Sequence, residues 1–124
     1  MEYEEIAPDF EAGPLEELAQ VLPAATVLEL AASFYESVAS CLAQLDAAAK
    51  ASDWSLIKDQ AHDLKGISGT FGASRLQQLA AELEHAIGMS SAQAAVTLRE
   101  MYETFAAARK EIDAMLSTSK SEAA

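Results

Sequence analysis

Apolar residues recur every three or four positions along most of the chain, which is the spacing of amphipathic helices. A first, short stretch covers residues 15–22, with Pro14 in its first turn and Pro23 stopping it. A long stretch from about 24 to 49 follows, and its apolar positions are Leu30, Phe34, Val38, Cys41, Leu42 and Leu45. The pattern therefore predicts a short helix followed by a long one.

Three further helical stretches complete the pattern. One begins after an N-cap at Ser52 or Asp53 and runs to about Gly69, with the stripe Trp54, Ile57, Ala61, Leu64 and Ser68. The next follows a glycine-rich turn, ends at Gly88 and carries Leu76, Leu79, Ala80, Leu83 and Ile87. The last starts at Ser90 or Ser91 and carries Ala95, Leu98, Met101, Tyr102, Phe105, Ala108, Ile112 and Met115.

Long helices joined by short turns pack as antiparallel neighbours. We therefore expect an all-α fold, an antiparallel up-down-up-down four-helix bundle with a short extra N-terminal helix, over residues 14–116. Residues 1–13 are expected to form a flexible acidic segment that packs locally through Tyr3, Ile6 or Phe10. Residues 117–124 are expected to form a flexible C-terminal tail.

The 124 residues carry a formal net charge of -12, from 20 acidic and 8 basic side chains. Such a charge repels a phosphate backbone or an anionic lipid surface, so neither nucleic acid nor membrane is an expected partner. The sequence has no signal peptide and no apolar run long enough to cross a bilayer, and a single cysteine, Cys41, allows no internal disulfide. These features favour a cytoplasmic protein, for which a monomer is the default expectation.

Sequence motifs for cofactors are missing. The chain contains no glycine-rich phosphate loop, no zinc-protease helix motif and no cluster of Cys and His residues. We therefore expect no intrinsic cofactor and no metal site.

The helix around His62 departs from an ordinary bundle helix. Gly66 and Gly69 lie on the face of His62, at i+4 and i+7, and a glycine in a helix interior costs about 1 kcal/mol relative to Ala. Their presence indicates that something approaches this face closely. Lys58 and Lys65 flank His62 at i-4 and i+3, where positive charges disfavour protonation of the imidazole and keep it nucleophilic.

A nucleophilic imidazole can accept a phosphoryl group, and Lys65 would offer a positive charge to the oxygens of that group. Lys58 and Arg75 either extend this local positive field or are solvated surface charges. Phe71, in the turn beside the glycines, is either an exposed docking contact or a core residue. His85 is expected to be an ordinary surface histidine.

A joint pattern surrounds His62 and consists of Ala61-His62-Asp63-Leu64-Lys65-Gly66, Ser68, Gly72-Ala73, Leu76, Leu79-Ala80 and Leu83-Glu84. This pattern resembles the histidine-containing phosphotransfer (HPt) domain, and the resemblance extends over about residues 15–116. The upstream Asp53-Trp54 is similar to the turn that precedes the histidine helix of that family.

The resemblance implies that His62 is phosphorylated at its exposed ring nitrogen, that Lys65 steadies the phosphoryl group and that Gly66 makes room for a receiver domain. It also implies that Glu84, on the facing helix, hydrogen-bonds the imidazole and fixes its tautomer. Relatives commonly have Gln or Glu at this position, and what the carboxylate adds is left open. The expected contacts with the partner are Lys58, Gly69, Phe71 and Arg75.

By the same resemblance, phosphoryl groups move reversibly between His62 and an aspartate in the receiver domains of response regulators or hybrid histidine kinases. The chain would be an intermediate in a two-component phosphorelay without kinase activity of its own, and the receiver would bring the Mg²⁺. An alternative is a non-catalytic module that sequesters a receiver, which needs the glycines but not His62. Structural oligomerisation is disfavoured because no heptad pattern is sustained.

Overall fold

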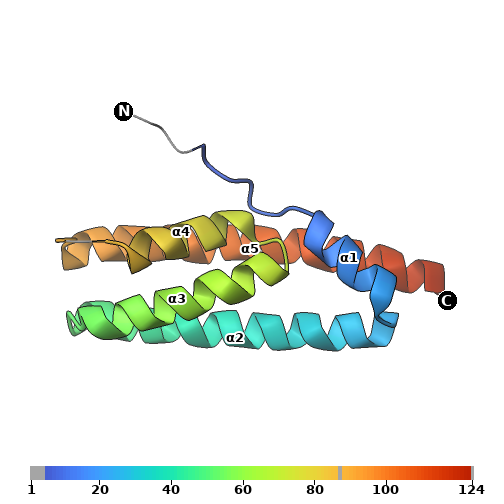
Figure 1. Ribbon diagram of the computed structural model, residues 1–124, viewed down its shortest axis with the longest axis horizontal. Coiled ribbons are helices and arrows are strands. Elements are labelled where there is room, and N and C mark those ends of the chain that lie inside the picture. The colour runs from blue at the N-terminus through green and yellow to red at the C-terminus, as the bar shows by residue number, and fades with distance from the viewer. Residues whose placement is uncertain (1–4, 87, 124) are drawn as a thin grey trace.

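The protein is described by a computed structural model that covers the backbone of residues 5–86 and 88–123 and side chains as far as Thr118. This part of the chain is all-helical and contains no strand, which confirms the expected fold class. The helices are α1 (Gly13–Val21), α2 (Ala24–Lys50), α3 (Trp54–Thr70), α4 (Ser74–Glu84) and α5 (Ser91–Ala123). Figure 1 shows α2, α3, α4 and α5 running in alternating directions, with α1 at one end.

The four longer helices enclose one core. Helix α2 packs against α3 and α5, and α4 packs against the same two helices, so each helix has two neighbours. Each contributes the apolar side of its stripe, which stabilises the bundle because this surface is removed from water. The largest fully buried apolar side chains are Leu15, Val38, Leu42, Leu45, Leu64, Leu76, Leu79, Met101 and Ile112.

Two caps fix the starts of α3 and α5, which lie at the same end of the bundle. Asp53, one of the two N-cap candidates, accepts a 3.2 Å hydrogen bond from the backbone N–H of Leu56 at the start of α3. Ser90 and Gln93 form a reciprocal capping box at the start of α5, with hydrogen bonds of 2.8 and 3.1 Å. The helix starts predicted at Asp53 and Ser90 are therefore confirmed.

The segment before α1 lies against α4 and is fixed there by specific hydrogen bonds. The side-chain amide of Gln78 accepts from the N–H of Ala7 at 2.9 Å and donates to the carbonyl of Glu5 at 2.7 Å. The N–H of Arg75 donates to the carbonyl of Pro8 at 2.9 Å. Phe10 packs on the core, as expected, whereas Ile6 is exposed and Tyr3 lies outside the described residues. The flexibility of residues 1–13 stays a prediction, but these contacts were not foreseen.

Several expected boundaries and core positions differ from the structure. Helix α5 continues to Ala123 instead of ending near 116, because no Pro or Gly interrupts it. Helix α4 ends at Glu84, earlier than the predicted end at Gly88, and the predicted core residue Ile87 lies outside the described residues. Some side chains expected in the core are exposed because they lie at the margins of their stripes or at a helix end: Leu30, Trp54, Ala95 and Tyr102.

None of the helices in the described part of the chain combines the length and the hydrophobicity that crossing a membrane requires. Within the same residues, no group of three or more His, Cys, Asp or Glu side chains is arranged to hold a metal ion.

Candidate functional site

His62 lies on the outward side of α3, next to α4. Its side chain is 65% exposed, and its Nδ1 atom is 2.6 Å from Oε1 of Glu84. Glu84 is the last residue of α4, and its side chain is only 10% exposed. The close packing of α3 on α4 brings these two residues together although they are 22 positions apart in the sequence. The expected contact between Glu84 and the imidazole is present.

The contact with Glu84 selects one tautomer of the His62 ring. An ionised carboxylate can only accept hydrogen bonds, so Nδ1 must carry the proton and donate it to Oε1. In the neutral imidazole the lone pair then resides on the other ring nitrogen, Nε2. The site therefore presents a nucleophilic nitrogen on a largely exposed ring.

Lys65 contacts the same carboxylate from one turn further along α3. Its Nζ lies 2.6 Å from Oε2 of Glu84, and its side chain is 32% exposed. Glu84 thus uses one oxygen for His62 and the other for Lys65. The Nε2 atom of His85 is 3.9 Å from that second oxygen as well.

These neighbours keep Glu84 ionised. The ion pair with Lys65, followed by the hydrogen bond from His62, lowers the pKa of Glu84 to about 2, and partial burial opposes the shift only in part. At neutral pH the residue is therefore a carboxylate, which is the form that orients His62. Lys65, which is held next to this carboxylate, balances its negative charge.

The two glycines on the His62 face have different surroundings. A Cβ atom added at Gly66 would meet no atom within 4 Å, so this position is open to solvent and to a partner. A Cβ atom at Gly69 would lie 2.7 Å from Nε2 of Gln77. That atom is the end of the flexible, exposed side chain of Gln77, which can move aside, so the packing of α3 on α4 requires glycine at neither position.

Lys58 lies one turn before His62 and is exposed. It borders a groove of about 500 Å³ between the start of α3 and the end of α4, together with Trp54, Met89 and Glu84. The groove was not predicted, because it depends on where the loop after α4 passes the first turn of α3. Its position leaves Lys58 available to a partner that approaches His62.

Arg75 does not belong to this cluster. It is at the start of α4, nine residues before Glu84, which corresponds to about 14 Å along a helix. Its guanidinium group is bound to Glu100 of α5 and donates a 2.7 Å hydrogen bond to Gln78. The expectation that Arg75 extends the positive field around His62, or contacts a partner there, is wrong because its charge is used to join α4 to α5.

Phe71 is a core residue. Its side chain is 6% exposed, and its ring stacks on Phe34 of α2 with a centroid distance of 4.6 Å. The turn after α3 directs the ring inward. Of the two readings that the sequence left open, docking contact or core, the structure selects the core.

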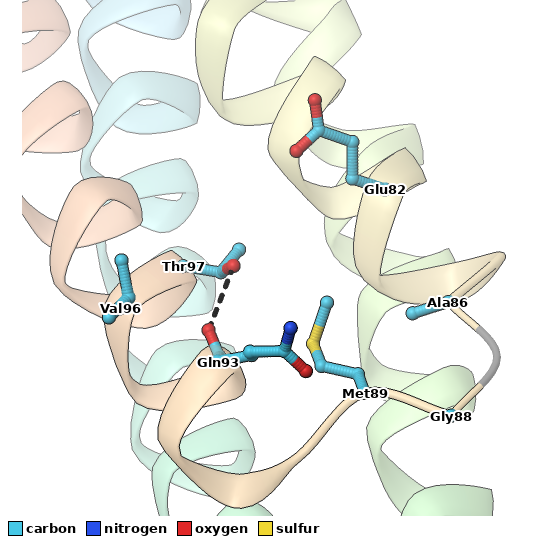
Figure 2. A pocket seen from close by; sticks show the side chains of 7 residues that line it. All are labelled: Glu82, Ala86, Gly88, Met89, Gln93, Val96 and Thr97. Carbon is cyan, nitrogen blue, oxygen red and sulfur yellow. Dashed lines mark hydrogen bonds between the residues drawn. The ribbon is translucent and has the colours of Figure 1, made fainter.

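A second hollow, of about 600 Å³, lies between the end of α4 and the start of α5, and Figure 2 shows the side chains that line it. The side chains of Met89 and Gln93 lie next to each other in it, and the hydroxyl of Thr97 donates a 3.2 Å hydrogen bond to the carbonyl of Gln93. It contains neither His62 nor Lys65. The hollow is therefore separate from the candidate site.

One of the comparisons with known proteins found a match. The family model of the Hpt domain matches residues 29–121. No curated protein and no solved structure matches the chain. The matched region includes α3 and α4 with His62, Lys65, Gly66 and Glu84, and it begins after α1. Because the match covers most of its length, the chain belongs to the Hpt domain family.

Proposed function

We propose that this protein carries a phosphoryl group on Nε2 of His62 and exchanges it with the aspartate of a receiver domain. Membership of the Hpt family places the chain in histidine phosphotransfer of two-component signalling. The observation that supports this assignment to His62 is the 2.6 Å contact between its Nδ1 atom and Glu84, on a ring that is 65% exposed. The contact leaves Nε2 as the nucleophile.

In the proposed transfer, the lone pair of Nε2 attacks the phosphorus of the receiver's aspartyl phosphate. The N–P bond forms while the P–O bond to the aspartate breaks, and the aspartate leaves as a carboxylate. Nδ1 keeps its proton, so the ring becomes positively charged. Glu84, held 2.6 Å from Nδ1, stabilises this charge, and the reverse reaction passes through the same arrangement.

The neighbours of His62 have distinct roles in this proposal. Lys65 is the cation for the phosphoryl oxygens, and Gly66 provides the space into which the receiver docks. Lys58 and Gly69 are contacts with the receiver. The receiver would bring the Mg²⁺ that neutralises the transferred group, and the protein would act as a carrier without kinase activity of its own.

The test is transfer from a radiolabelled phosphorylated receiver in the presence of Mg²⁺. We expect acid-labile, base-stable label on the wild-type protein and none on His62→Gln. His85→Gln removes the neighbouring exposed histidine, and this variant should still accept label.

Absence of label from a broad panel of receivers, with the protein folded, would contradict the proposal. If receivers nevertheless bound with equal affinity to wild-type protein and His62→Gln, the protein would be a module that sequesters them. The two results are separated by measuring binding and transfer on the same samples.

A further inference from the structure

Lys65 and His62 share one acceptor group, and this sharing conflicts with the role of Lys65 in phosphoryl transfer. The Nζ atom of Lys65 is 2.6 Å from Oε2 of Glu84, while Oε1 of the same carboxylate is 2.6 Å from Nδ1 of His62. The charge of Lys65 is therefore already paired in the free protein. It is also held on the side of Nδ1, whereas the phosphoryl group is accepted by Nε2 across the ring.

The arrival of a phosphoryl group changes this balance of charges. A phosphoryl group on Nε2 has three strongly accepting oxygens and close to two negative charges, whereas Glu84 has one. At the same time the imidazole becomes positive and can pair with Glu84 alone. The imidazolium then pairs the negative charge of Glu84, so Lys65 is free to pair with the negative charge of the phosphoryl oxygens.

We propose that Lys65 is paired with Glu84 in the unphosphorylated protein, and that Lys65 leaves Glu84 and pairs with the phosphoryl oxygens as the N–P bond to His62 forms. The inference rests on the proposed phosphotransfer through His62. It makes the ion pair between Lys65 and Glu84 part of the reaction, because the pair must break for transfer in one direction and re-form for transfer in the other.

The side chains at this site fit such an exchange. Lys65 is a flexible side chain and is 32% exposed, so it can change partners without disturbing the core. Glu84 is held by its position at the end of α4 and is 10% exposed, so it stays with His62. His85, 3.9 Å from the same oxygen of Glu84, lies near the place that Lys65 would vacate.

Two roles are conceivable for the pair of Lys65 and Glu84: Lys65 changes partners during the reaction, or it only holds Glu84 in place. The two roles predict opposite effects of Lys65 on how much Glu84→Gln slows the phosphorylation of His62. If Lys65 moves to the phosphoryl group during the reaction, then Glu84→Gln frees Lys65 before the reaction begins. The positive charge of the freed Lys65 then offsets part of the rate that is lost with the Glu84 carboxylate. If Lys65 only holds Glu84 in place, then Glu84 works best when Lys65 is present. Glu84→Gln suits this test because the Gln oxygen can still accept from Nδ1, while the amide cannot pair with a cation.

The experiment measures the rate of phosphorylation of His62 by phosphoramidate, a small donor that requires no docked receiver. Nε2 of His62 attacks the phosphorus of phosphoramidate, the P–N bond of the donor breaks, and the amino group, which is already protonated in this donor, leaves as ammonia. The four proteins are wild type, Glu84→Gln, Lys65→Ala and the double variant, with Lys110→Ala as a control because Lys110 is an exposed lysine on α5. We expect Glu84→Gln to lower the rate less when Lys65 is present than when it is Ala, by about threefold or more.

A second readout follows the side-chain ammonium resonance of Lys65 by nitrogen NMR. It should shift on Glu84→Gln and again when His62 is phosphorylated, while that of Lys110 stays constant. Equal or reversed effects of Glu84→Gln in the two backgrounds, or a Lys65 resonance unchanged by phosphorylation, would overturn the exchange although His62 accepts phosphate. No phosphate on His62 in any of the proteins would overturn the proposed function itself, and the exchange with it.

Discussion

The backbone N–H of Glu11 donates a 2.8 Å hydrogen bond to the carbonyl oxygen of Gly72, in the turn between α3 and α4. Gly72 has a φ of 74°, a conformation that residues with side chains rarely adopt. A Cβ atom at this position would lie 2.0 Å from the carbonyl oxygen of Glu11. The turn that ends the histidine helix therefore depends on glycine for two reasons, its own conformation and the chain that crosses it.

Gly72→Ala should lower the free energy of unfolding by about 2–4 kcal/mol. About 1–2 kcal/mol of this comes from the left-handed backbone, and the rest from displacing the N-terminal segment. Gly88→Ala is the matched control, since Gly88 has a φ of 73° but no atom within 4 Å of the added Cβ. Urea unfolding of both variants should show the larger loss for Gly72. Equal losses would mean that the contact with Glu11 contributes nothing.

Gly66→Ala should make the protein more stable and the phosphotransfer slower. The added methyl group meets no atom within 4 Å, and Ala is favoured over Gly in a helix interior by about 1 kcal/mol. The same methyl group lies one turn after His62, where a receiver would dock. Urea unfolding should show the gain in stability.

A kinetic comparison separates docking from chemistry in Gly66→Ala. Transfer from a phosphorylated receiver should fall, whereas phosphorylation by phosphoramidate should be nearly unchanged because this donor is small. A receiver that transfers equally well to the variant would show that Gly66 does not provide docking space.

The helical periodicity of the sequence was sufficient to predict the number, order and approximate ranges of the helices. The expected contact of Glu84 with His62 came from the family resemblance, because spacing within one helix cannot show which residues of two helices meet. For the same reason the pairing of Lys65 with that carboxylate was not predicted. Such contacts depend on how α3 and α4 are rotated and shifted against each other.

Two physical causes explain the residues that the sequence placed wrongly or left open. Arg75 and Phe71 lie near the turn after α3, where the direction of a side chain depends on the conformation of Gly72 and not on helical periodicity. Trp54 begins α3 at the end of the bundle, so it is 38% exposed although it falls on the apolar stripe. Periodicity says which face of a helix is buried, but not where the neighbouring helices stop.

Ser68→Ala should raise the free energy of unfolding by about 1 kcal/mol. The hydroxyl of Ser68 is fully buried in the core and has no hydrogen-bond partner among the described residues. An unsatisfied polar group in such a place is unfavourable, and Ala removes it at a small cost in packing. Thr104→Val is the contrasting variant, because the Thr104 hydroxyl is also buried but donates to Asp9.

Thermal or urea unfolding should therefore move in opposite directions for the two hydroxyl deletions. Thr104→Val loses a hydrogen bond and leaves Asp9 without its donor, which should cost about 1 kcal/mol. If Ser68→Ala were as destabilising as Thr104→Val, the Ser68 hydroxyl would have to be hydrogen-bonded in solution.

Acid should weaken the folded state in part through Glu84. Contacts with Lys65 and His62 lower its pKa from the ordinary value of 4.5 to about 2. Because folding lowers this pKa, ionised Glu84 stabilises the folded protein above pH 4.5, and the contribution is lost as the pH falls towards 2. Glu84→Gln cannot titrate, so its unfolding free energy should fall less steeply than that of the wild type over this range. Glu36→Gln, at an exposed carboxylate on α2, is the control and should keep the wild-type slope. Identical slopes for wild type and Glu84→Gln in urea unfolding would show that Glu84 does not gain these contacts on folding.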